Sequence, residues 1–134
     1  MSVEKALGIS SQTAMELLQA RWSAWTKQRP VLAVVTPTDV GHRLRHVDAR
    51  TAGEVMHAFA WLAATDGADD TEAAMVLAWM MLPVAGRVAG ELRTLSPDID
   101  SLVASQLWVE VRTVNWRASS RVAGNIGKSL RRNL

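Results

Sequence analysis

The feature that most constrains the fold is an apolar stretch between about Thr71 and Leu95. Its apolar residues recur every three or four positions, the spacing that places side chains along one face of an α-helix. These residues are Ala73, Leu77, Met80, Met81, Val84, Val88, Leu92 and Leu95. Because the centre of the stretch is apolar on every side, we expect a buried central helix. Pro83 lies within it and is expected to kink the helix or split it in two.

A membrane-spanning helix is the competing interpretation of this stretch. The run without charged residues, from Ala73 to Gly86, contains 14 residues, whereas a membrane span needs about 20. The first residues, Met1-Ser-Val-Glu-Lys, also lack the apolar core of a signal peptide. We therefore expect a cytoplasmic protein without a membrane segment.

The same three-four spacing predicts further helices over about 11–27, 48–64, 99–114 and 121–132. Thr36-Pro37-Thr38-Asp39 is typical of the start of another, short helix, because Thr36 can cap it and proline suits the first helical position. Asp48 is a second capping candidate. Ser96-Pro97-Asp98 is expected to begin the helix after the central one, and Ser119 or Ser120 to cap the last.

Two segments are expected to be irregular. Residues 1–9 show no clear pattern, and the run 31–35 is predicted to be a buried extended connector because no second strand is available to pair with it. The chain has 134 residues, 49% of them hydrophobic, enough for one core. The predicted fold is all-α: a single-domain orthogonal bundle of about six helices, with 1–69 as N-terminal helices and 70–134 as a three-helix core. The residues expected to be buried include Leu77, Met81, Val84, Val88, Leu107 and Ile126.

Charge is segregated along the chain behind a net charge of only +2. No acidic residue follows Glu110, and residues 1–111 hold nine basic against thirteen acidic residues. Such segregation favours a basic face for a polyanion, and a solvated basic helix end is the alternative. Both stay open. The basic residues after Glu110 are Arg112, Arg117, Arg121, Lys128, Arg131 and Arg132.

No residue pattern supports catalysis, a metal site or a cofactor. His42 and His46 are four apart, as a metal pair on a helix requires, but Arg43 and Arg45 beside them repel a cation. His57 is expected on a helix surface. The chain has no cysteine, no phosphate-binding glycine loop and no Ser-His-Asp arrangement.

A cluster of acidic residues precedes the central helix. Its members lack the alternating ligand positions of a calcium loop. Acidic side chains at a helix start are favoured by the helix dipole, which is the simpler interpretation. The cluster consists of Asp66, Asp69, Asp70 and Glu72.

The most specific pattern lies in the last two predicted helices. The segment Asp98-Ile-Asp-Ser-Leu-Val-Ala-Ser-Gln-Leu-Trp-Val-Glu-Val-Arg112 has an acidic start and a Trp near its end, and Arg121-Val-Ala-Gly-Asn125 leads to the pair Arg131-Arg132. These segments resemble two consecutive helices of bacterial sigma-factor region 2. The resemblance covers about residues 70–134, and the chain also looks like a group of actinobacterial proteins with a sigma-like helical core.

The resemblance implies two binding surfaces. In the family, the first of these helices docks on a coiled coil of the largest RNA polymerase subunit, and the second, with the loop before it, holds melted promoter DNA. The implied polymerase-facing residues are Asp98, Asp100, Gln106, Trp108 and Arg112. The implied DNA-facing residues are Arg117, Arg121, Asn125, Lys128, Arg131 and Arg132, with Trp116 as a stacking or wedge aromatic.

The chain departs from the family pattern in two respects. Lys128 stands where the family usually has Asp, and Gly124 and Gly127 weaken the helix by about 1 kcal/mol each relative to Ala. The chain also ends where the family continues to a second DNA-reading domain, which implies a truncated sigma factor or a lone regulatory domain.

The sequence therefore predicts a non-enzymatic domain that binds DNA or RNA polymerase in transcription control. The alternative is a helical protein–protein adaptor without a nucleic-acid role. Homo-oligomerisation is left open.

Overall fold

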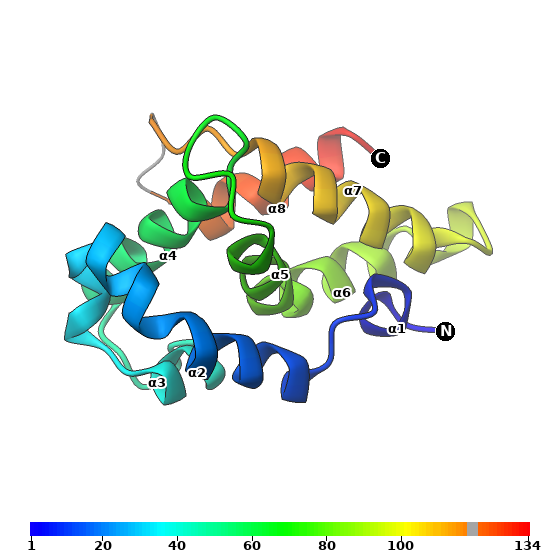
Figure 1. Ribbon diagram of the computed structural model, residues 1–134. Coiled ribbons are helices and arrows are strands. Elements are labelled where there is room, and N and C mark those ends of the chain that lie inside the picture. The colour runs from blue at the N-terminus through cyan, green and yellow to red at the C-terminus, as the bar shows by residue number, and fades with distance from the viewer. Residues whose placement is uncertain (118–120) are drawn as a thin grey trace.

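The computed structural model describes residues 1–117 and 121–134, which contain helices and no β-strand (Figure 1). Helices hold 74% of the chain, so the all-α prediction is confirmed. The α-helices of the described residues are α1 (Val3–Leu7), α2 (Ser11–Gln28), α3 (Pro37–Gly41), α4 (Ala49–Ala63), α5 (Thr71–Met80), α6 (Leu82–Glu91), α7 (Ile99–Thr113) and α8 (Val122–Arg132). Two 3-10 helices, η1 (Pro30–Val34) and η2 (Arg93–Leu95), lie between them.

The central helix of the fold is α5, which packs against α2, α4, α6 and α7. Figure 1 shows it between α2 and α4 on one side and α6 to α8 on the other. All residues from Val76 to Met80 are buried, as the apolar pattern predicted. Of the other expected core residues, Met81, Val88, Leu107 and Ile126 are buried. Val84 is only half-buried, at the point where α6 meets Gly127 of α8.

Pro83 splits the predicted long helix into α5 and α6, which are bent by 57°. Proline has no backbone N–H, so the carbonyl of Trp79, four residues earlier, loses its usual helical donor. Arg43 supplies the missing hydrogen bonds, because its Nε and Nη2 lie 3.3 and 3.1 Å from that carbonyl oxygen. Its guanidinium also stacks 3.9 Å from the centroid of the Trp79 ring.

The backbone around Arg43 is strained. Arg43 and Leu44 have φ angles of 54° and 60°, a left-handed conformation that non-glycine residues rarely adopt. Leu44 is buried in the core and Arg43 is anchored at Trp79. These two anchors hold the strained turn in place and join α3 to the break between α5 and α6.

Several sequence-based expectations were wrong. Residues 1–9 are not loose: Val3–Leu7 form α1, which Ser2 caps by accepting from the Lys5 N–H at 3.1 Å. The run 31–35 is not extended, since most of it forms the 3-10 helix η1. The helix expected to begin at Ser96-Pro97 begins at Ile99 instead. With α1 added and the central helix divided, the described residues hold eight α-helices rather than about six.

Other local predictions are confirmed. Thr36 and Asp39 form a capping box at the start of α3. Asp48 caps α4 by accepting from the Thr51 N–H at 3.0 Å. The expected cap at Ser119 or Ser120 lies outside the described residues.

In the described part of the chain, no single helix is both long and apolar enough to cross a membrane. The pair formed by α5 and α6 reaches the length and composition of a span, but only as two helices bent against each other.

We predict that Arg43→Ala destabilises the fold by about 1–3 kcal/mol, because the carbonyl of the buried Trp79 loses both hydrogen bonds from the guanidinium. Chemical denaturation followed by circular dichroism measures this. Arg45→Ala is the matched control, since Arg45 is exposed and its Nε bonds only the nearby carbonyl of His42; we expect a change within about 0.5 kcal/mol. Equal losses in the two variants would contradict the role assigned to Arg43.

Candidate nucleic-acid interface

The six basic residues that follow Glu110 divide into two groups in the structure. Arg112, Arg117 and Arg131, here called the paired cations, each form an ion pair with a carboxylate. Arg121, Lys128 and Arg132, here called the unpaired cations, are exposed and form no such pair within the described residues.

Arg112 connects α7 to the loop between α4 and α5. Its guanidinium donates to the carbonyl of Ala63 at 3.0 Å and to the carboxylate of Asp69. Its own carbonyl accepts from the N–H of Thr65 at 2.9 Å. With a side chain only 18% exposed, Arg112 is a structural residue and is poorly placed to contact a partner.

Arg117 and Trp116 are held together by Asp66. The indole Nε1 of Trp116 donates to Asp66 Oδ1 at 3.1 Å, and Arg117 pairs with the same carboxylate. The guanidinium of Arg117 lies 4.4 Å from the centroid of the Trp116 ring. A base that stacks on this face of Trp116 therefore has to displace Arg117.

His57 also contacts the segment that contains Trp116 and Arg117. It was expected on a helix surface, but it is half-buried, and its Nε2 lies 2.7 Å from the carbonyl oxygen of Trp116. His57 therefore fixes the backbone of the segment against α4.

Arg131 joins α8 to α6. Its Nε and Nη2 bond the two carboxylate oxygens of Glu91 at 3.0 and 3.2 Å, the two-point geometry that suits a guanidinium and a carboxylate. Like Arg112 and Arg117, it is paired with a carboxylate of the same chain.

The unpaired cations lie along α8. Arg121 is the residue before the first turn of the helix, and Lys128 and Arg132 follow at spacings of seven and four. Such spacings place the three side chains on one side of a helix. Arg132 makes only a long contact, 3.5 Å from its Nη2 to Ser129 Oγ.

A groove of about 320 Å³ runs between the C-terminal part of α7 and α8. Glu110 and Thr113 line it from α7, and Asn125, Lys128 and Arg132 line it from α8. Two of the unpaired cations and Asn125 therefore border one concave surface, which the sequence pattern alone did not reveal.

Glu110 is the unexpected member of this groove. It is only 8% exposed, and Gln106 and Asn133 donate to its Oε1 at 2.8 and 2.9 Å. Burial alone raises the pKa of Glu110, but hydrogen bonds from Ser129, Asn133 and Gln106, together with the charge of Arg132, outweigh that effect and hold the pKa below its ordinary value. The groove therefore contains a carboxylate that stays ionised at neutral pH.

The implied polymerase-facing residues do not form one open surface. Asp100 is 6% exposed and accepts from both guanidinium nitrogens of Arg93 at 3.2 Å, an arrangement that holds the pKa of Asp100 below its ordinary value. Gln106 donates a hydrogen bond from its amide to the carboxylate of Glu110. Asp98 is exposed at the start of α7.

Trp108, the remaining member of that set, is half-buried. It lines a second groove of about 460 Å³ between α1 and α7, opposite Leu7 and Ile9 and beside Met75 of α5. Trp108 therefore packs in part against the hydrophobic core.

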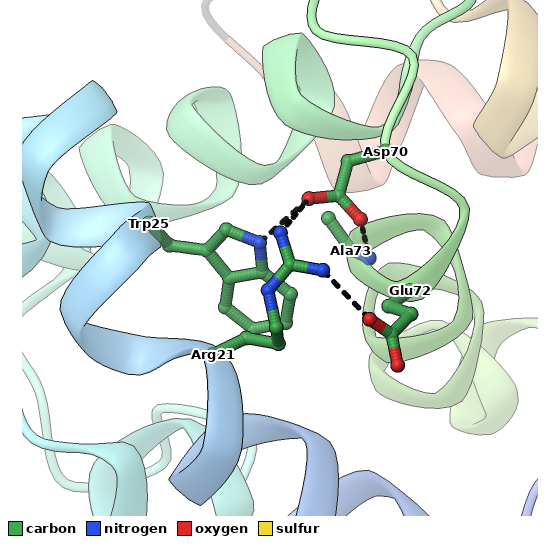
Figure 2. Close-up of polar contacts among 5 residues, drawn as sticks. All are labelled: Arg21, Trp25, Asp70, Glu72 and Ala73. Atoms are coloured by element: carbon green, nitrogen blue, oxygen red, sulfur yellow. Dashed lines mark hydrogen bonds and ion pairs between the residues drawn. The ribbon is translucent and has the colours of Figure 1, made fainter.

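The acidic residues before α5 form ion pairs and hydrogen bonds with side chains from other segments of the chain. Asp70 accepts from Arg21 at 2.9 Å and from the indole Nε1 of Trp25 at 2.8 Å, and it caps α5 through the N–H of Ala73 at 3.1 Å (Figure 2). Glu72 pairs with the same arginine at 2.6 Å. The sequence analysis placed these acidic residues at a helix start but did not reveal the partners of Asp70 on α2.

His42 and His46 lie beyond the end of α3 and are exposed, with ring centroids 6.4 Å apart. No group of three or more potential metal ligands occurs in the described residues.

No family model, curated protein or solved structure matches the chain. The candidate interface is therefore defined by its own geometry: a row of unpaired cations beside a groove that holds one ionised carboxylate.

The paired carboxylates predict how stability depends on pH. Hydrogen bonds from Arg117 and Arg131 hold the pKa values of Asp66 and Glu91 below their ordinary values. A carboxylate with a lowered folded-state pKa stabilises the fold above its unfolded pKa, near 4, and loses this contribution as the pH falls further. We expect a melting temperature that is level between about pH 7 and 5 and falls below about pH 4.

The double variant Asp66→Asn, Glu91→Gln isolates this effect. At neutral pH the melting temperature of the variant should be lower than that of the wild type. The difference should shrink as the pH drops through the lowered pKa values of the two carboxylates. A constant difference between the two proteins across the whole pH range would show that the ion pairs do not cause the acid sensitivity.

Proposed function

We propose that this chain is a non-enzymatic domain that binds single-stranded or locally melted nucleic acid through α8. The observation that carries the proposal is the division of the C-terminal cations. Three of them are paired with carboxylates of the chain, and the other three lie along α8 or at its start. Exposed cations without a carboxylate partner among the described residues are available for phosphates, which are the dominant source of nucleic-acid affinity.

The surroundings of α8 support a single strand as the ligand. The groove beside Lys128 and Arg132 is also lined by the polar residues Asn125 and Thr113. Cations that follow a groove, with polar groups to contact the bases, are typical of single-strand binding sites. Here Arg117 and Trp116 contribute only if the contact with Asp66 opens.

The resemblance to sigma-factor region 2 extends the proposal to transcription control in the cytoplasm, with promoter DNA as the nucleic acid and RNA polymerase as the protein partner. The matching helices are α7 and α8. Lys128 stands where the family usually has an acidic residue and forms no ion pair within the described residues, so it can add a phosphate contact in this chain.

A second candidate function is that of a protein–protein adaptor, and one observation favours it. Leu102 and Val109 are each 49% exposed on α7, and their spacing of seven places them on one face of the helix. Large exposed apolar residues in a row are typical of docking surfaces. For an adaptor, α7 and not α8 would form the binding surface.

Replacing the first and last unpaired cations tests the proposal. Three phosphate contacts predict a slope of log affinity against log salt of about −2 on single strands, and Arg121→Ala with Arg132→Ala should reduce it to about −0.7. Fluorescence anisotropy of a labelled single strand at several salt concentrations measures both slopes.

The control is Lys5→Ala with Lys27→Ala, which removes the same charge from exposed positions of α1 and α2 and should leave the slope near −2. If both double variants behave alike, α8 is only a solvated basic helix. If the wild type binds no nucleic acid even at low salt, with or without polymerase, the adaptor function is favoured.

A further inference from the structure

Glu110 is difficult to explain as part of a surface that only binds phosphate. A carboxylate repels phosphate oxygens, yet this one lies in the groove that Lys128 and Arg132 border. Its burial makes any unsatisfied or mismatched contact costly. A ligand that fills this groove must therefore present a hydrogen-bond donor to the carboxylate and a negative charge to the cations.

The carboxylate retains capacity for one more donor. An ionised carboxylate has about four acceptor positions. Gln106 and Asn133 both donate to Oε1, and the hydroxyl of Ser129 donates to the same carboxylate. One position is left, and Glu110 belongs to the lining of the groove.

The groove has apolar as well as polar lining residues. Val114 and Ile126 belong to its lining, although both are largely buried. The volume of about 320 Å³ is at the lower end of the range for ligand pockets, about 300–1,000 Å³. The groove therefore has room for a single base.

We propose, on the basis of the proposed function, that the groove takes one unpaired nucleobase that carries an exocyclic amino group. The amino group donates to Glu110, and Lys128 and Arg132 hold the neighbouring phosphates. Cytosine, adenine and guanine carry such an amino group, and acceptance by Glu from the cytosine amino group is a known mode of base reading. Thymine has no amino group, and its only N–H lies between two carbonyl oxygens. The partial negative charge of these oxygens repels a carboxylate.

Two oligonucleotides of equal length, oligo-dC and oligo-dT, test this directly by anisotropy. We expect the wild type to bind oligo-dC about tenfold more tightly, the discrimination that one good base contact provides. An oligo-dC whose cytosines carry N4,N4-dimethyl groups lacks the amino N–H and should bind no better than oligo-dT. This arm needs no protein variant, so it does not depend on the folding of a mutant.

Glu110→Gln provides the protein arm. With the amide oxygen accepting from Gln106 and Asn133, the NH₂ group replaces the acceptor in the groove by a donor. We expect affinity for oligo-dC to fall to that for oligo-dT, with oligo-dT affinity unchanged. Glu16→Gln, an exposed position on α2, removes the same charge and should keep the tenfold preference.

The outcomes separate the two proposals. If the wild type binds oligo-dC and oligo-dT equally and both affinities fall with salt, the base-reading inference is overturned and the proposed function stands. If a well-folded Glu110→Gln protein keeps the preference for oligo-dC, or if the dimethylated strand binds as tightly as oligo-dC, Glu110 does not read the base. If no strand binds at low salt, both proposals fail.

Discussion

The α5 helix is apolar around its whole circumference, so every side of it has to be covered by another part of the chain, and the positions of α2, α4 and α7 follow from that need. Asp70 begins this helix and ties it to α2 through Arg21 and Trp25 (Figure 2). At the other end Pro83 stops the helix, and Arg43 replaces the hydrogen bond that proline cannot make. The two ends of α5 thus fix where the surrounding helices pack.

The segregated charges along the sequence form ion pairs within the fold as well as an exposed basic surface. The acidic loop between α4 and α5 receives Arg112 and Arg117, and Glu91 receives Arg131. These contacts hold the C-terminal helices against the acidic N-terminal part of the chain. Of the C-terminal cations, only the unpaired cations on α8 are exposed without a carboxylate partner among the described residues, so about half of the C-terminal basic charge is uncompensated.

Local signals were predictable from the sequence, and contacts between distant residues were not. The capping box at Thr36 and the cap at Asp48 depend on neighbours within three residues, and both are confirmed. The 3-10 form of η1 and the short α1 have too few residues for a periodic pattern. Which basic residues are paired depends on partners dozens of residues away, and the place of Glu110 in the groove depends on how α8 packs on α7.

The most direct test of this account is a titration of the ¹⁵N-labelled protein with a single-stranded oligonucleotide, observed at the side-chain resonances of the arginines. The account predicts that the Nε signals of Arg121 and Arg132 shift early in the titration, because both are unpaired and exposed. Those of Arg112 and Arg131 should stay in place, since Asp69 and Glu91 hold them. Equal shifts at all four arginines, or shifts confined to the paired ones, would contradict the division of the C-terminal cations on which the proposed function depends.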